Sequence, residues 1–207
     1  MKCCHWMNFI GGLLVSEASA FIRIPRERIG VLIGPSGSVK EQIEKTLGVK
    51  LLIDSSTGDV TIELNPENDD PSKLFRAKDV VTAIGRGFSP EKAFRLLEDE
   101  NVMLDIIDLR QIFGKSESNM KRVRGRIIGR EGKTRRIIEE LTETYISVYG
   151  HTVGIIGSFE QVQIAREAIE MLIRGAMHGT VYRYLHRKRR EIKKRMLELW
   201  EKPEEEI

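Results

Sequence analysis

Hydrophobic and polar positions pass through the same sequence of patterns in both halves of the chain. In the first half, a stretch of alternating residues predicts a strand, and two short stretches with apolar residues every three to four positions predict helices. Two further strands are joined by a polar, turn-rich connector, and a long helical pattern follows with a break expected near residues 85–87. The predicted strands are residues 20–25, 49–54 and 60–64, and the helices are residues 26–33, 38–47 and 72–97.

The second half repeats this order and adds one more helix. Its predicted strands are residues 102–109, 145–149 and 153–156, and its helices are residues 118–128, 133–141, 159–174 and 179–200. Each half is thus β-α-α-β-β-α. The fold class expected is α+β, in which each half forms a small three-stranded antiparallel sheet with helices on one face.

A short glycine motif marks the same point in both halves. Ile33-Gly34-Pro35-Ser36-Gly37 is followed 95 residues later by Ile128-Gly129-Arg130-Glu131-Gly132. Further along, similar residues such as Ala77 and Ala165 are only 88 apart, so the first copy carries about seven extra residues, which we place at 65–71. The repeat predicts two domains, 1–101 with a core of about 20–100 and 102–207 with a core of about 102–177 and a basic carboxyl-terminal helix.

This arrangement resembles a type I KH domain, with Ile-Gly-x-x-Gly between the first two helices of a β-α-α-β-β-α module. Glycines at a tight turn leave backbone amides accessible beside the positive end of the second helix, so a phosphate backbone can approach closely. The resemblance implies two tandem KH modules that clamp about four nucleotides of single-stranded RNA each.

Charge separates the two halves and favours the second as the RNA-binding half. Residues 1–101 hold 13 Lys/Arg against 15 Asp/Glu, whereas residues 102–195 hold 20 against 11. Basic residues crowd around the second loop, and we expect roughly half of them to touch RNA. The expected RNA-binding residues there are Gly129, Arg130, Glu131, Gly132 and Lys133 with the flanking Arg124, Arg126 and Arg136. Glu131 is expected to pair with Arg135, four residues further along a helix.

The first loop is expected to bind RNA more weakly. It consists of Gly34, Pro35, Ser36 and Gly37, and nearby basic residues are offset by acidic ones. Its role is left open between RNA contact and protein contact. The basic run at residues 187–190 is likewise either a further phosphate-binding surface or a solvated helix face.

The second half has a more specific resemblance, to the partner-of-Nob family of ribosome assembly factors. It rests on residues 125–134, on Gly157-Ser158-Phe159 and on the pattern over residues 165–182. The resemblance implies a factor that binds the single-stranded 3′ region of small-subunit ribosomal RNA and assists the PIN-domain endonuclease Nob, without catalysis and without a cofactor. Archaeal relatives are also linked to the alpha subunit of translation initiation factor two.

Three alternatives compete with this interpretation. A nucleotide-hydrolysing enzyme would need Gly-x-x-x-x-Gly-Lys-Ser/Thr after a strand, but Ile127 stands where the first glycine is required. A general KH protein that binds messenger RNA or single-stranded DNA has the same composition. A structural adaptor would use the loops only to join helices. Adjacent Cys3 and Cys4, and the short apolar run at residues 9–15, fit a cytoplasmic protein without a membrane span.

Overall fold

The computed structural model describes residues 19–65 and 70–201, with side chains described up to residue 198. Both cysteines and the apolar run at residues 9–15 lie outside the described residues, as do residues 66–69 of the predicted insertion. The first module consists of β1 (Ser19–Arg23), α1 (Arg26–Ile33), a 3-10 turn (Pro35–Gly37), α2 (Ser38–Leu47), β2 (Val49–Ile53), β3 (Asp59–Leu64), α3 (Ser72–Gly85), α4 (Pro90–Ala93) and α5 (Arg95–Glu98).

The second module repeats this order and contains one helix that the sequence pattern missed. It consists of β4 (Val102–Asp108), α6 (Leu109–Phe113), α7 (Glu117–Ile128), a 3-10 turn (Arg130–Gly132), α8 (Lys133–Thr142), β5 (Tyr145–Tyr149), β6 (Thr152–Ser158), α9 (Phe159–Ile173) and α10 (His178–Glu201). Leu109 was predicted to end the strand but begins α6, because the side chain of Asp108 accepts a hydrogen bond from the Arg110 amide and caps the new helix.

Each module contains an antiparallel sheet of three strands with its last strand in the middle. The orders are β1-β3-β2 and β4-β6-β5. The registers correspond: Leu51 pairs with Ile62 in the first sheet, and Ile146 pairs with Ile155 in the second. All four side chains are buried beneath the helices. Apolar residues at every second strand position therefore build the two cores.

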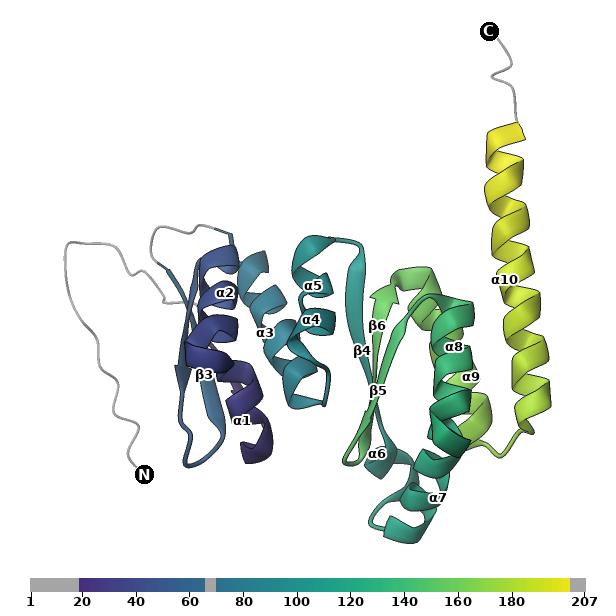
Figure 1. Cartoon of the computed structure of the whole chain (residues 1–207), viewed down its shortest axis with the longest axis horizontal. Coiled ribbons are helices and arrows are strands. Elements are labelled where there is room, and N and C mark those ends of the chain that lie inside the picture. The colour runs from purple at the N-terminus through teal and green to yellow at the C-terminus, as the bar shows by residue number, and fades with distance from the viewer. Residues whose placement is uncertain (1–18, 66–69, 202–207) are drawn as a thin grey trace, which may run out of the picture.

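The layers are stacked along the long axis of the molecule, so that the second sheet is covered on both faces (Figure 1). The helices α7, α8 and α9 cover one face, and α3, α4 and α5 of the first module lie against the other. Phe88 is fully buried there against Gly154, where a Cβ atom would lie 2.6 Å from its ring. Ser147 on β5 donates a hydrogen bond of 3.0 Å to the carbonyl of Arg86. The two modules thus share an apolar interface.

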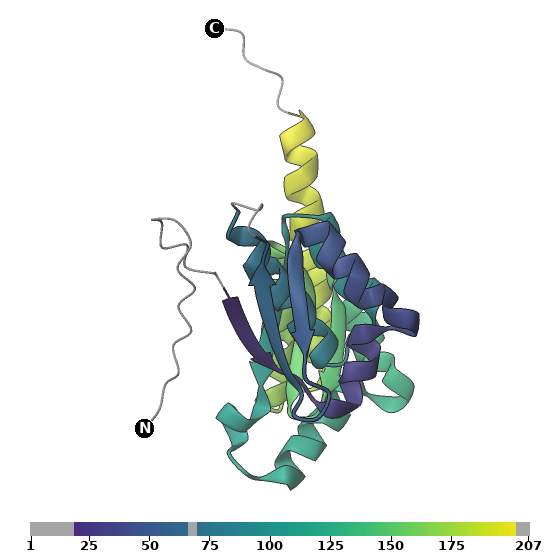
Figure 2. The same cartoon turned by 90° about the vertical axis from the view of Figure 1, so that its left-hand side faces the viewer.

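The first sheet has no such cover on its outer face among the described residues. Viewed along the stack, this sheet lies in front of the other layers (Figure 2). Phe21 on β1 is 75% exposed, and Leu52 on β2 is 43% exposed. The two sheets therefore differ in surroundings although their strand orders match.

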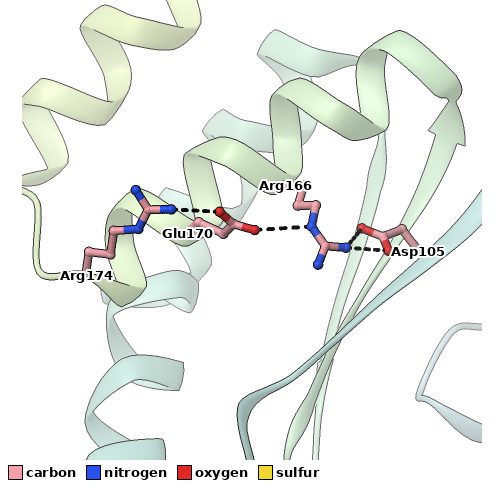
Figure 3. A network of polar contacts seen from close by, with 4 residues as sticks. All are labelled: Asp105, Arg166, Glu170 and Arg174. Atoms are coloured by element: carbon pink, nitrogen blue, oxygen red, sulfur yellow. Dashed lines mark hydrogen bonds and ion pairs between the residues drawn. The ribbon is translucent and has the colours of Figure 1, made fainter. Parts of the chain in front are cut away.

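A polar network fastens α9 to the edge of the second sheet (Figure 3). The guanidinium of Arg166 donates to both carboxylate oxygens of Asp105 on β4, at 2.7 Å each. Glu170, one turn further along α9, accepts from both Arg166 and Arg174. Nη1 of Arg166 donates both bonds to Asp105 and Nε donates to Glu170, so the guanidinium is held between two carboxylates. The helix that lies behind α7 and α8 is thereby held in register with the sheet.

Candidate nucleic-acid interface

The two glycine loops have the same backbone conformation. Gly34 has φ 74° and ψ 176°, and Gly129 has φ 72° and ψ 176°. The third loop residues, Ser36 and Glu131, are left-handed with φ values of 52° and 54°. The two loops therefore share one backbone structure.

The first glycine of each loop is required by conformation and by space. A φ near +72° with ψ near 180° is accessible essentially only to glycine. A Cβ atom on Gly34 would lie 2.5 Å from Cγ2 of Val39, and one on Gly129 would collide with Oγ1 of Thr134. The chain thus turns directly against the first turn of the following helix.

The last glycine of the second loop is required for a different reason. Gly132 is left-handed, with φ 76°, but a Cβ atom there would meet only the ends of arginine side chains at 3.9 Å. The space above it is therefore open. Because no side chain fills this space, another backbone can approach the start of α8.

Backbone donors face this open space. The Gly132 amide closes the turn by donating to the carbonyl of Gly129 at 3.3 Å. In the described parts of the chain, the amides of Arg130 and Glu131 donate to no protein acceptor. These two amides precede the amino terminus of α8, where the helix dipole adds positive potential. The loop can therefore bind an anionic oxygen without rearranging.

Three of the predicted basic residues lie around the second loop on its solvent-exposed side. Arg130 and Lys133 are exposed, and neither forms an ion pair with another described residue. Arg136 is also exposed, and it donates to the carbonyl of Glu131 at 2.8 Å. The three side chains line a shallow depression of about 460 Å³ beside the loop. Their charges are available to a polyanion.

The other two predicted basic residues hold the surrounding structure together. Arg124 donates to the carbonyl of Gly150 at 2.6 Å, which connects α7 to the turn between β5 and β6. Arg126 donates to the carbonyl of Ala176 at 2.5 Å, which connects α7 to the segment before α10. Both side chains are half-buried. The predicted basic set therefore divides into three side chains that are exposed at the surface and two that position the loop.

The expected pair between Glu131 and Arg135 is not formed. Arg135 approaches Glu139 instead, at 3.8 Å. Glu131 occupies the left-handed position of the turn, so its side chain does not continue the geometry of the following helix. The spacing of four residues predicts contact only when both residues are helical. Glu131 thus remains an exposed acidic residue within the loop.

The first loop has fewer free charges. Lys40 lies 3.8 Å from Glu44, and Arg28 points away from the loop and donates to the carbonyls of Ile84 and Phe88. Arg26 is exposed on the first turn of α1. The guanidinium of Arg28 also lies 6.0 Å from the centroid of the Tyr149 ring in the second module, so it belongs to the interface between the modules, a role that its position in the sequence did not indicate.

The base of α10 lies directly behind the second loop. The hydroxyl of Tyr182 is 3.1 Å from Oγ1 of Thr134, and the ring of His178 is 3.0 Å from the carbonyl of Arg126. Thr134 is the residue against which Gly129 turns. These contacts join residues about 50 positions apart, and no local sequence pattern signals them. The one clue is that Thr134 replaces the apolar Val39 of the first copy.

Features of several other protein classes are missing from the described residues. No helix in that part of the chain is long and apolar enough to cross a membrane, and no group of three or more His, Cys, Asp or Glu side chains is placed to hold a metal ion. The second loop follows α7 and not a strand, unlike the phosphate loop of nucleotide-hydrolysing enzymes.

Comparison with protein-family models assigns both modules to the KH fold. Residues 19–99 match the KH domain model, and residues 103–190 match the eukaryotic type KH-domain (KH-domain type I) of PNO1. A KH domain-containing protein of Methanocaldococcus jannaschii is 49% identical over 93% of this chain and 83% of its own length. The chain belongs to the PNO1 family. The predicted fold class and the resemblance to the partner-of-Nob family are confirmed.

Two further PNO1-family relatives are informative. The pre-rRNA-processing protein PNO1 of Chaetomium thermophilum is 40% identical over 61% of this chain, which corresponds to 48% of that protein. A chain in the crystal structure of an a/eIF2alpha–aDim2p–rRNA complex from Pyrococcus horikoshii is 50% identical. It superimposes with a TM-score of 0.80, covering 86% of this chain and 97% of that chain.

Proposed function

We propose that this protein is a non-catalytic RNA-binding factor in assembly of the small ribosomal subunit. It binds single-stranded ribosomal RNA near the 3′ end and assists maturation of that end. The observation that carries the proposal is the second glycine loop, which combines free backbone amides with exposed Arg130 and Lys133. The relative in the rRNA complex supports ribosomal RNA as the ligand.

In this proposal the second loop contributes more to RNA binding than the first. Gly129, Arg130, Glu131, Gly132 and Lys133 contact the RNA, with Arg136 at the rim and Arg124 and Arg126 holding the loop in place. The first loop offers the same backbone geometry with fewer free cations, so Gly34, Pro35, Ser36 and Gly37 contribute a weaker contact to RNA or to protein. The backbone loop positions the strand, and base edges are read elsewhere in the groove.

Two protein partners follow from the family and from the solved relative. The PIN-domain endonuclease Nob is the enzyme that this factor would assist, as the resemblance to the partner-of-Nob family implies. The alpha subunit of initiation factor two is the second partner, as in the complex from Pyrococcus horikoshii. We infer from these partners that the protein acts in the cytoplasm.

Crosslinking in cells tests the ribosomal assignment. RNA recovered with the protein should concentrate near the 3′ end of small-subunit ribosomal RNA. Reads spread over messenger RNA would instead support the general KH regulator and leave the fold unaffected. A cleavage assay with purified Nob tests the partnership: the protein should change the rate of 3′-end cleavage, and Arg130→Asp with Lys133→Asp should abolish that change.

The non-catalytic assignment is tested separately with nucleoside triphosphates. The protein should show no turnover above background with or without RNA. Turnover that disappears in Lys133→Ala would contradict the assignment, because Lys133 follows Gly132 of the second loop and precedes Thr134, the order found at the end of a phosphate loop.

A further inference from the structure

The second module contains a basic pocket that the glycine loops do not explain. It has a volume of about 480 Å³ and lies between α6, the first half of α7 and the turn after β5. Its lining includes Arg110, Lys121, Arg124 and His151, with Glu117 as the acidic member. Helices α6 and α7 thus bring three permanent cations to one concave surface, and the turn after β5 adds His151.

Two of these cations have no partner among the described residues. The side chains of Arg110 and Lys121 are exposed and form no hydrogen bond or ion pair within that part of the chain. Arg124 is held toward the turn by its bond to the Gly150 carbonyl. The nearby Asp108 carboxylate is already engaged by the Arg110 amide at 2.8 Å, and it lies 4.0 Å from the His151 ring. Three permanent cations therefore outnumber the carboxylates of Glu117 and Asp108, and the pocket keeps a net positive charge.

His151 contributes a neutral polar group to this pocket. Burial lowers the pKa of its imidazole below 6.5, and the charges of Arg110 and Arg86 act in the same direction, while Asp108 opposes them. At neutral pH the ring is therefore uncharged and can donate or accept one hydrogen bond. An anionic oxygen in the pocket would contact the cations of Arg110 and Lys121 and could form a hydrogen bond with the His151 ring.

One face of α7 leads from the pocket toward the second loop. Lys121, Gly125 and Ile128 share one face of α7, at spacings of four and three residues. Gly125 is exposed, and a Cβ atom there would meet nothing within 4 Å. Lys121 precedes Gly129 by eight residues, which is about 12 Å along a helix. A strand that leaves the loop can thus follow α7 to the pocket.

The pocket is a property of the second module. In the first module, β1 ends at Arg23 and α1 begins at Arg26, so no helix intervenes. In the second module, α6 and its connection occupy residues 109–116 and supply Arg110. Helix α6 thus extends the same module whose loop carries the free cations, so it can lengthen the RNA site of that module.

We propose that this pocket binds a phosphate group of the RNA strand beyond the nucleotides clamped by the second loop. The inference rests on the proposed RNA-binding function and extends its site along α7. The ligand recognised is the backbone of a continuing single strand, so the pocket adds affinity for long RNA without selecting bases. An acidic protein segment would satisfy the same charges and is the competing occupant.

RNA length separates these possibilities. Fluorescence anisotropy would measure binding of two fragments from the 3′ end of small-subunit ribosomal RNA, one of about four nucleotides and one of about ten. Lys121→Glu should lower affinity for the longer fragment by about tenfold, and leave the shorter within about twofold. Arg110→Glu should behave alike. Lys78→Glu, which reverses an exposed helical lysine on α3, is the matched control and should change neither.

The same experiment distinguishes failure of this inference from failure of the proposed function. Arg130→Asp should weaken both fragments. If it does, but Lys121→Glu and Arg110→Glu leave the longer fragment unaffected or weaken both fragments equally, the pocket is not an extension of the RNA site. If Arg130→Asp weakens neither fragment, the loop assignment itself is wrong. Circular dichroism of each variant establishes that it is folded.

Discussion

Glu139 on α8 accepts a hydrogen bond of 2.8 Å from the backbone amide of Ile146 on the edge strand β5. The first module contains the same contact, in which Glu44 accepts from the amide of Leu51 at 2.8 Å. In both modules a basic residue four positions earlier lies 3.8 Å from the glutamate, Arg135 in one and Lys40 in the other. The duplication thus preserves how the second helix is fastened to the edge strand.

Removing this contact should destabilise the module. Glu139→Ala leaves a half-buried edge amide without its acceptor and should lower the free energy of unfolding by about 1–3 kcal/mol. Glu139→Gln keeps an acceptor oxygen and should cost less. Urea denaturation measures both values. Equal losses in the two variants would mean that the charge near Arg135, and not the hydrogen bond to Ile146, stabilises the fold.

The two glycines of the second loop should respond differently to alanine. Gly129→Ala forces a side chain into a backbone region reserved for glycine and against Thr134, so we expect a loss of about 1–3 kcal/mol. Gly132→Ala meets open space and carries only the cost of a left-handed residue, about 1 kcal/mol. Thermal or urea unfolding compares them. A larger loss in Gly132→Ala would contradict the geometry described for this loop.

The polar network on α9 tests whether a less exposed ion pair stabilises the fold more than an exposed one. Asp105 is 19% exposed and accepts two bonds from Arg166, so Asp105→Ala should lower the free energy of unfolding by about 1–3 kcal/mol. Arg174 pairs with Glu170 at the surface and is 76% exposed, so Arg174→Ala should change stability by about 0–0.5 kcal/mol. Similar losses in both variants would show that exposure does not control the strength of these pairs.

His151 should make the protein less stable in acid. Burial, Arg110 and Arg86 lower the pKa of its ring in the folded protein, so the unfolded chain takes up the proton more readily. The contribution of the neutral His151 ring to the free energy of unfolding should be fully present above pH about 6.5 and should decrease as the pH falls below that value. His151→Gln should reduce this dependence when unfolding is measured between pH about 5 and 7.5. An unchanged slope in the variant would exclude His151 as its source.

The order of elements could be predicted because each element has a local signal. Glycines at positions 34, 48 and 129 end helices, and alternation over β2 and β3 distinguishes the buried face of the first sheet from its outer face. Helix α6 was missed because its five residues are too few to show helical periodicity and directly continue an apolar strand. Glycine spacing similarly located both candidate loops.

The sequence could not predict which basic residues are free at the site. In the sequence, four arginines close to the glycine loops look alike: Arg28, Arg124, Arg126 and Arg130. The first three, however, each donate to a backbone carbonyl 26 to 60 residues away. Such bonds depend on how the layers stack, which local patterns do not encode. The misassigned partner of Arg135 has the same origin, since the left-handed turn at Glu131 interrupts the helix on which the spacing rule depends.

The most direct test of the central claim is the salt dependence of RNA binding. Binding of single-stranded RNA from the 3′ end of small-subunit ribosomal RNA would be measured for the wild type, for Arg130→Asp with Lys133→Asp, and for Ser36→Asp in the first loop. We expect the double variant to bind much more weakly than Ser36→Asp. The slope of log affinity against log salt should become shallower by about 0.7 for each RNA phosphate that the double variant no longer neutralises. Unchanged affinity and slope in the double variant would contradict the account.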